Sequence, residues 1–202
     1  MQSDLFGDKR EIPLQDGSLT LWSNILPFYE LLPTYAYLEN GLAWRQDEIQ
    51  IMGKLVPVPR LNVLYGDEGL SYAYSGVRFP ALTWTEILWK LKVIVEELTG
   101  CRFNSVLCNF YRDGQNSVAW HSDDEPELGE EPQIASLSFG ATRIFHLRHR
   151  LRSDISPLKL SLEDNTLLLM GKGTQKNWEH QVPKMKSCTK GRINLTFRWI
   201  EA

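Results

Sequence analysis

The chain has 202 residues, 43% of them apolar, which is enough to bury a substantial core, so we expect one large domain. No apolar stretch approaches the roughly 18 residues of a membrane span, and no secretory leader is evident, so we expect an intracellular protein without membrane contact. A net charge of -3 argues against a protein that coats nucleic acid through bulk charge, and three cysteines without a CxxC argue against a disulfide framework.

The N-terminal part of the chain begins with a polar stretch. Residues 1–17 show no periodicity, so we expect a flexible tail followed by a single domain over residues 18–202. A first helix is expected over residues 27–40, interrupted by Pro33 and ended by Gly41. Residues 48–52 alternate before Gly53 and Lys54, which is typical of a hairpin with its tip near Met52.

The clearest helix signal lies over residues 84–98. Apolar residues recur along one face, Thr83 and Glu86 are spaced as a capping box, and Gly100 follows the last apolar position. Before this helix, residues 71–74 are typical of a short aromatic strand.

Beyond residue 100 the sequence consists mostly of short strand patterns separated by turns. The strands are expected over residues 106–111, 118–121, 134–139, 143–147, 158–162, 166–170 and 193–200. Many short strands after two helices favour a mainly β, α+β fold, in which a jelly roll (double-stranded β-helix) carries flanking N-terminal helices on its outside.

Two of these strands carry polar groups with unusual spacing. Asn109 and Tyr111 share one face of the first strand, and His121 and Asp123 follow two residues apart. One His and one carboxylate are two ligands of a 2-His-1-carboxylate Fe(II) site, and His180 is the best candidate for the third. The alternative is that these histidines are hydrogen-bonded structural residues, which is the commoner case for an isolated His.

The last strand supports the metal hypothesis. Arg192, Asn194, Thr196 and Arg198 alternate with apolar residues and therefore share one face. Two inward arginines are costly to bury without an anion, so this row predicts a bound dicarboxylate. A 2-oxo acid and O2 could occupy the three metal positions that the protein leaves open, with Asn109 and the Tyr111 hydroxyl completing its hydrogen bonds.

Charge is distributed unevenly along the sequence. Residues 1–140 contain 10 Lys and Arg against 20 Asp and Glu, whereas residues 141–202 contain 12 against 5. The basic C-terminal third could face a phosphate backbone, or its charges could be ordinary solvated ones. Charge alone leaves both alternatives open.

The span from residue 44 to residue 199 resembles the AlkB family of Fe(II)- and 2-oxoglutarate-dependent dioxygenases. The resemblance rests on Asn109-x-Tyr111, His121-x-Asp123 and His180, followed by Arg192-x-Asn194-x-Thr196-x-Arg198, in this order. Residues 104–109, 121–125 and 134–141 are most similar to the human DNA-repairing members. The resemblance implies Fe(II) on the two histidines and Asp123, Arg192 on the distal carboxylate of 2-oxoglutarate, and Arg198 near Asp123.

The same resemblance implies oxidative demethylation of N-alkylated bases such as 1-methyladenine and 3-methylcytosine in DNA. Decarboxylation of 2-oxoglutarate to succinate would accompany the oxidation, and formaldehyde would be released. Two alternatives stay open, an RNA demethylase and a non-catalytic reader of modified nucleic acid. The intact ligand set argues against the reader.

The resemblance also implies substrate contacts. Tyr74 would stack on the flipped base, Tyr72 and the adjacent Ser75 would lie beside it, and Glu125 would face its exocyclic amino group. An aromatic pair in the core is an equally good reading of the two tyrosines.

Contacts with the rest of the nucleic acid are also implied. Met52 could wedge into a duplex and Arg60 could hold backbone phosphates, whereas residues 173–184 are more similar to a homologue that prefers single strands. Single- versus double-strand preference stays open.

A short N-terminal motif suggests a further partner. Gln2-Ser3-Asp4-Leu5-Phe6 resembles the peptides by which bacterial repair proteins dock on the sliding clamp. We therefore expect a monomer that is cytoplasmic and nucleoid-associated if the protein is bacterial, with possible clamp contact through Gln2–Phe6.

Overall fold

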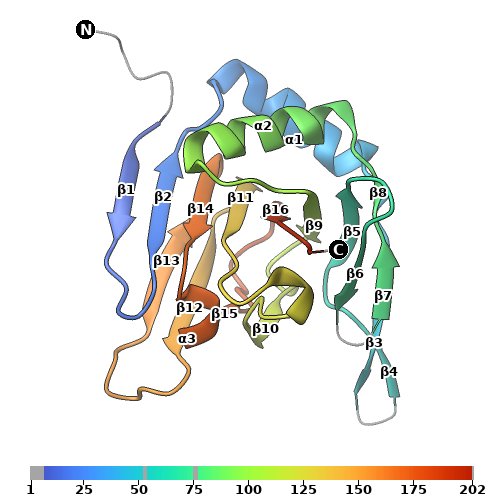
Figure 1. The fold of residues 1–202 in the computed structure, drawn as a ribbon. Coiled ribbons are helices and arrows are strands. Elements are labelled where there is room, and N and C mark those ends of the chain that lie inside the picture. The colour runs from blue at the N-terminus through green and yellow to red at the C-terminus, as the bar shows by residue number, and fades with distance from the viewer. Residues whose placement is uncertain (1–6, 52–53, 75–76, 202) are drawn as a thin grey trace, which may run out of the picture.

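The computed structural model describes residues 7–51, 54–74 and 77–201 (Figure 1). The helices are α1 (Phe28–Gly41), α2 (Glu86–Thr99), α3 (Thr174–Asn177) and the 3-10 turn η1 (Pro126–Leu128). The strands of the N-terminal half are β1 (Lys9–Ile12), β2 (Leu19–Ser23), β3 (Glu48–Ile51), β4 (Lys54–Pro57), β5 (Leu61–Gly66), β6 (Ser71–Tyr74), β7 (Val77–Pro80) and β8 (Leu82–Thr83). The later strands are β9 (Ser105–Tyr111), β10 (Val118–His121), β11 (Ile134–Gly140), β12 (Arg143–His149), β13 (Leu158–Leu162), β14 (Thr166–Met170), β15 (Trp178–Val182) and β16 (Arg192–Arg198).

Two sheets form the centre of the molecule. The larger has eight strands in the order β1-β2-β14-β11-β16-β9-β5-β8, and the smaller has four in the order β10-β15-β12-β13. Helices α1 and α2 pack against the face of the larger sheet that is turned away from the smaller sheet (Figure 1). The predicted mainly β fold with two sheets and flanking helices is confirmed.

Alternation along the central strands produces two separate cores. On β9, Val106 and Cys108 point toward the helices, whereas Leu107 and Tyr111 point into the space between the sheets. The helix-side core gives rigidity to the larger sheet. The inter-sheet core stops short at one end, where polar side chains replace apolar ones and the candidate site lies.

The cap of α2 differs from the prediction. Its N-cap is Thr85, whose hydroxyl accepts a hydrogen bond from the Leu88 N–H at 3.3 Å, and Thr83 instead ends β8. The expected capping box from Thr83 is therefore wrong, because the short β8 strand pushes the helix start two residues later. The C-terminal end is as predicted, since Gly100 has φ of 70°, a left-handed conformation that favours glycine.

The prediction of a flexible tail over residues 1–17 is wrong for residues 9–12, which form β1. β1 pairs antiparallel with β2, from Lys9 opposite Trp22 to Ile12 opposite Leu19. The side chains of β1 are mostly exposed, so the strand is held by main-chain pairing and leaves no hydrophobic pattern in the sequence. Residues 1–6, including the clamp-like peptide, lie outside the described residues.

None of the helices that the structure describes has both the length and the apolar composition of a membrane span.

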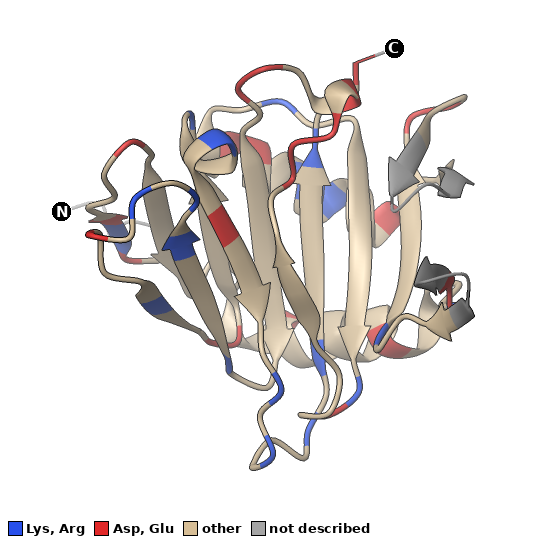
Figure 2. Ribbon diagram, turned by 90° about the horizontal axis from the view of Figure 1, so that it is seen from below, with Lys and Arg blue, Asp and Glu red and all other residues tan. Residues whose placement is uncertain are grey.

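The excess of Lys and Arg in the C-terminal third is divided between the interior and the surface. Arg143, Arg192 and Arg198 are buried, whereas Lys184 and Lys190 are exposed in the loop between β15 and β16. Figure 2 shows Lys and Arg predominating in the loops at one end of the strands.

Candidate active site

Three potential metal ligands converge from two neighbouring strands of the smaller sheet. His121 ends β10, Asp123 follows it by two residues, and His180 occupies the middle of β15, where it pairs directly with His121. Their ligand atoms all lie within 4.8 Å of one another, and the two imidazole centroids are 4.3 Å apart. The structure therefore brings together the three residues that the sequence predicted as one site.

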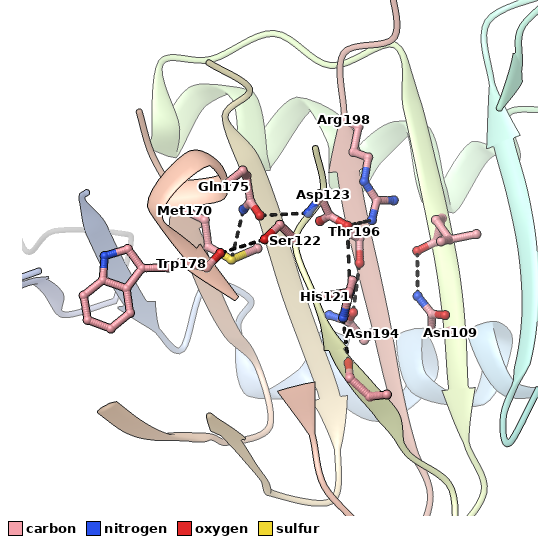
Figure 3. Close-up of polar contacts among 12 residues, drawn as sticks. Asn109, His121, Ser122, Asp123, Met170, Gln175, Trp178, Asn194, Thr196 and Arg198 are labelled. Atoms are coloured by element: carbon pink, nitrogen blue, oxygen red, sulfur yellow. Dashed lines mark hydrogen bonds and ion pairs between the residues drawn. The ribbon is translucent and has the colours of Figure 1, made fainter. Parts of the chain in front are cut away.

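Arg198 controls the charge of the carboxylate in this cluster. Its Nη2 donates to Asp123 Oδ1 at 2.9 Å, and both side chains are buried (Figure 3). Burial by itself would raise the pKa of Asp123, but Arg198, His180 and His121 outweigh it and lower that pKa to about 2. Asp123 is thus an anion at any physiological pH.

Each of the two histidines can offer a ring nitrogen to a metal ion. Burial, followed by the proximity of His121, lowers the pKa of His180 to about 3, so its imidazole is uncharged at neutral pH. His121 Nδ1 lies 2.8 Å from the carbonyl oxygen of Ala119. Because only a protonated Nδ1 can donate there, Nε2 is the nitrogen that can bind a metal, and this atom lies 3.9 Å from Asp123 Oδ1.

A divalent cation fits this donor set. The cluster contains two imidazoles and one carboxylate, and His180 Nδ1 is a buried ring nitrogen without a hydrogen-bond partner among the described residues. Two His and one carboxylate on one side of an ion are the ligands of non-haem Fe(II). His121, Asp123 and His180 would hold it.

A polar pocket opens beside the three ligands, between the two sheets. Its lining comes from β9, β10, β11, β12, β14, β15 and β16, together with Arg60 just before β5 and Asp123 just after β10. The strand residues are Leu107, Asn109, Tyr111, Val118, His121, Ser136, Phe145, Met170, His180, Val182, Arg192, Asn194, Thr196 and Arg198. The row expected on β16 is present in full. Its four polar residues all face the pocket, as the alternation predicted.

Arg192 is the residue in this pocket that most clearly requires an anion. Its guanidinium is 1% exposed, and Nη2 donates to Ser138 Oγ at 2.8 Å, but Nε and Nη1 have no hydrogen-bond partner among the described residues. Burial lowers the pKa of Arg192 to about 10, with Tyr111 acting in the opposite direction, so the group is still a cation at neutral pH. These two donors point to different edges of the guanidinium, so one carboxylate would pair with Nη2 and either Nη1 or Nε, and would satisfy one of the two.

The neighbouring polar residues on β16 hold each other in place. Thr196 Oγ1 donates to Asn194 Oδ1 at 2.9 Å, and Asn194 Nδ2 donates to Ser136 Oγ at 2.8 Å. Asn109 faces the same pocket, with Asn194 directly opposite it on the adjacent strand. The serines of β11 were not predicted as site residues, although Ser136 and Ser138 alternate with apolar residues in the sequence.

The structure contradicts the expected contact of Arg60 with backbone phosphates. Arg60 is 5% exposed, lines the pocket, and donates from Nε to Asn109 Oδ1 at 2.7 Å. Asn109 uses its oxygen to accept from Arg60, and its amide nitrogen donates to the Leu107 carbonyl at 3.5 Å, so the second hydrogen of that nitrogen is the one it can offer to an anion in the pocket. Tyr111 is also buried there, with the Arg192 guanidinium 5.4 Å from its ring centroid.

The predicted substrate contacts are only partly within the described region. Tyr72 and Tyr74 lie on β6, where their main chains pair with Phe79 and Val77 of β7. Glu125 begins η1, two residues after Asp123, and is half-buried. Met52 and Ser75 lie outside the described residues, so those two predictions are not tested.

Two facing sheets that carry a 2-His-1-carboxylate cluster beside a buried arginine pocket define a non-haem iron oxygenase of the jelly-roll type. A sequence profile described as the 2OG-Fe(II) oxygenase superfamily matches residues 18–198. The chain belongs to this superfamily and, within it, to the AlkB family that its motifs resemble. The family uses Fe(II), 2-oxoglutarate and O2.

Several characterised relatives are similar over most of the chain. The alpha-ketoglutarate-dependent dioxygenase alkB homolog 3 of Rattus norvegicus is 49% identical over 152 residues, which cover 71% of this chain and 51% of that protein. The DNA oxidative demethylase ALKBH2 of Mus musculus is 39% identical over 179 residues, covering 86% and 73%. This chain thus spans about half the length of the alkB homolog 3 relatives.

A solved structure shows the same fold. The protein described as "The structure of OsALKBH1" matches with a TM-score of 0.66 at 16% identity, over 94% of this chain and 100% of that chain. At this identity the match concerns the fold alone. It agrees with the jelly-roll arrangement of the two sheets.

Proposed function

We propose that this protein is a DNA oxidative demethylase that removes N-alkyl groups from bases such as 1-methyladenine and 3-methylcytosine. The observation that carries the proposal is the convergence of His121, Asp123 and His180 within 4.8 Å beside the unsatisfied donors of Arg192. The similarity to ALKBH2 and alkB homolog 3 supports the substrate class.

Fe(II), 2-oxoglutarate and O2, when bound, would supply the oxidising chemistry that converts the N-alkyl carbon to an aldehyde, with succinate and CO2 as the co-products. The residues of the chain supply position and charge. Arg192 and the Asn109 amide nitrogen would bind one carboxylate of the diacid, and the Arg198 guanidinium keeps Asp123 ionised and oriented. Leu107, Phe145 and Val182 line the same pocket and limit access of water.

Recognition of the base is proposed for the edge of this pocket. Tyr74 would stack on the extruded base, Tyr72 and Ser75 would lie beside it, and Glu125 would accept from its amino group. A base methylated on its pairing edge carries a positive charge, which favours an aromatic face next to a carboxylate. The unpaired state of such a base also reduces the cost of extrusion.

A product assay tests this function against its alternatives. Succinate and formaldehyde are measured with Fe(II), 2-oxoglutarate and methylated single-stranded DNA, double-stranded DNA or RNA. Turnover on DNA in preference to RNA is expected, and preference for RNA would make the protein an RNA demethylase. Bound iron without turnover on any of the three would instead indicate a reader of modified nucleic acid.

A matched pair of variants separates metal binding from substrate binding. Tyr74→Ala should reduce turnover of methylated DNA while leaving iron affinity unchanged, whereas His121→Ala should remove both. Loss of iron in Tyr74→Ala would contradict the proposed stacking role.

Further proposals concern partners and location. We propose that the protein works as an intracellular monomer, and that Gln2–Phe6 bind a sliding clamp if the protein is bacterial. Mixing the full chain with purified clamp tests this contact, and Leu5→Ala with Phe6→Ala should abolish it. Equal binding by the double variant would contradict the proposal.

A further inference from the structure

A glutamine on the short helix α3 contacts the metal-binding segment directly. The side-chain oxygen Oε1 of Gln175 accepts a hydrogen bond from the main-chain N–H of Asp123 at 3.0 Å (Figure 3). Gln175 is 1% exposed and precedes β15, the strand that carries His180. The side chain therefore links the segment that carries Asp123 to the start of the strand that carries His180.

Asp123 requires this contact because of where β10 ends. The strand stops at His121, so the main-chain N–H of Asp123 lies beyond the paired region of the sheet. Asp123 is 2% exposed, and a buried N–H without an acceptor is strongly unfavourable. By supplying the acceptor, Gln175 fixes the main chain from which the Asp123 carboxylate projects.

Gln175 is itself held by its surroundings. Its Nε2 donates to Met170 Sδ at 3.5 Å, which orients the amide so that Oε1 faces Asp123. At the two ends of α3, Thr174 Oγ1 donates to the Ser18 carbonyl at 3.0 Å and Asn177 Nδ2 donates to the Asp16 carbonyl at 2.7 Å. The helix is thus anchored to the turn between β1 and β2.

The turn before α3 permits this close approach. Gly173 has φ of 78°, and a Cβ at this position would lie 2.7 Å from the Asp16 carbonyl oxygen. Only glycine suits both the conformation and the contact. The position of α3 is therefore set by the main chain as well as by its side chains.

Two further contacts hold the residues on either side of Asp123, one from β15 and one from the segment after β12. Ser122 Oγ donates to the Trp178 carbonyl at 2.9 Å, and Arg150 Nη1 donates to Asp124 Oδ2 at 2.7 Å. These contacts reach the neighbours of Asp123. Among the described residues, the Gln175 amide is the side chain that hydrogen-bonds to the main chain of Asp123 itself.

We propose that Gln175 is a positioning residue for the metal, acting through the main-chain N–H of Asp123. The inference rests on the proposed function only in assuming that Asp123 is a metal ligand. Groups that orient metal ligands in this way typically change metal affinity by about 10- to 100-fold when they are removed. The effect should appear in metal binding before any reaction takes place.

The test compares Gln175→Met with wild type in the full chain. Methionine has nearly the same length but replaces the amide oxygen with a thioether, which is only a weak acceptor for the Asp123 N–H. We expect the dissociation constant for Mn(II), measured from free Mn(II) by electron paramagnetic resonance, to rise about 10- to 100-fold while the circular dichroism spectrum is unchanged. Gln133→Met, an exposed position just before β11, is the matched control and should bind Mn(II) as wild type does.

Different failures have different meanings. A Gln175→Met protein that binds Mn(II) within about twofold of wild type would overturn the inference, whatever its thermal stability. A wild-type protein that binds no Mn(II) would instead contradict the metal centre and with it the proposed function.

If Gln175→Met does not fold, a measurement on the wild-type protein tests the hydrogen bond between Gln175 and the Asp123 N–H. The Asp123 amide proton of the metal-free protein should exchange with solvent far more slowly than an unprotected amide. Exchange at the rate of an unprotected peptide would show that the hydrogen bond is absent in solution and would overturn the inference.

Discussion

Arg192 is the most informative position for testing how the pocket binds its co-substrate. Its buried guanidinium has two donors, Nε and Nη1, without partners among the described residues. A hydrogen bond to a charged group contributes about 1.5 to 3 kcal/mol. A carboxylate that accepts from one of these donors and from the adjacent Nη2 makes two such bonds, which contribute about 3 to 6 kcal/mol, or roughly 10²- to 10⁴-fold in affinity at about 1.4 kcal/mol for each factor of ten.

The substitution Arg192→Met removes both donors and keeps an apolar chain of similar reach. We expect the dissociation constant for 2-oxoglutarate, measured by titration calorimetry with Mn(II) in the absence of O2, to rise at least about 100-fold. The free energy of unfolding of the ligand-free protein should not fall, because the variant no longer buries a partly unsatisfied cation. A dissociation constant within about fivefold of wild type would refute the assignment of Arg192.

Arg143→Met is the matched control. Arg143 is also buried and lies 5.5 Å from the Tyr111 ring centroid, but it donates to the carbonyl oxygens of Asp113, Asn116 and Pro183. Removing it leaves those oxygens unpaired, so the free energy of unfolding should fall by about 1 to 3 kcal/mol or more. Arg192→Met should therefore lose affinity for 2-oxoglutarate without losing stability, whereas Arg143→Met should lose stability.

Three more predictions concern the metal ligands and the scaffold. Asp123→Ala should abolish Mn(II) binding in the same resonance assay and all turnover, and full turnover would contradict its role as a ligand. Because the pKa of His180 is lowered to about 3 while an unfolded His has its usual value near 6.5, the metal-free protein should lose about 1.4 kcal/mol of stability per pH unit below 6.5. Urea unfolding between about pH 5.5 and 4.5, where an unfolded His is almost fully protonated, should show this slope, reduced in His180→Gln, and equal slopes would argue against a buried neutral ring. Thermal unfolding should show a loss of about 1 kcal/mol for Thr85→Ala and almost none for Thr83→Ala, and the reverse order would restore the cap first predicted from the sequence.

The ligand set and the polar row of β16 could be predicted because strand alternation places their side chains on one face. Arg192 and Arg198 alternate with apolar residues, and the structure puts both in the pocket. His180 could be named only by its residue type and by the missing third ligand. Its pairing with His121 depends on the sheet topology, which spacing along the chain does not contain.

Other features had no signal that the sequence could provide. β1 was missed because exposed side chains and main-chain pairing leave no apolar pattern, and Arg60 was misplaced because its inward orientation depends on β5 pairing with β9. Gln175 was not singled out because its partner is a main-chain N–H more than fifty residues away. Contacts of this kind are properties of the folded structure.

The position of β10 at the edge of the smaller sheet has a consequence for the order in which the centre is assembled. Its pairing with β15 is irregular between Val118 and His121, so the strand has few hydrogen bonds to keep it in place. An ion bound by His121 and His180 would cross-link the two strands at their last pair. Binding of the ion would therefore stabilise the pairing of β10 with β15. The metal-free protein should be cleaved by proteases at this edge more readily than the metal-bound protein.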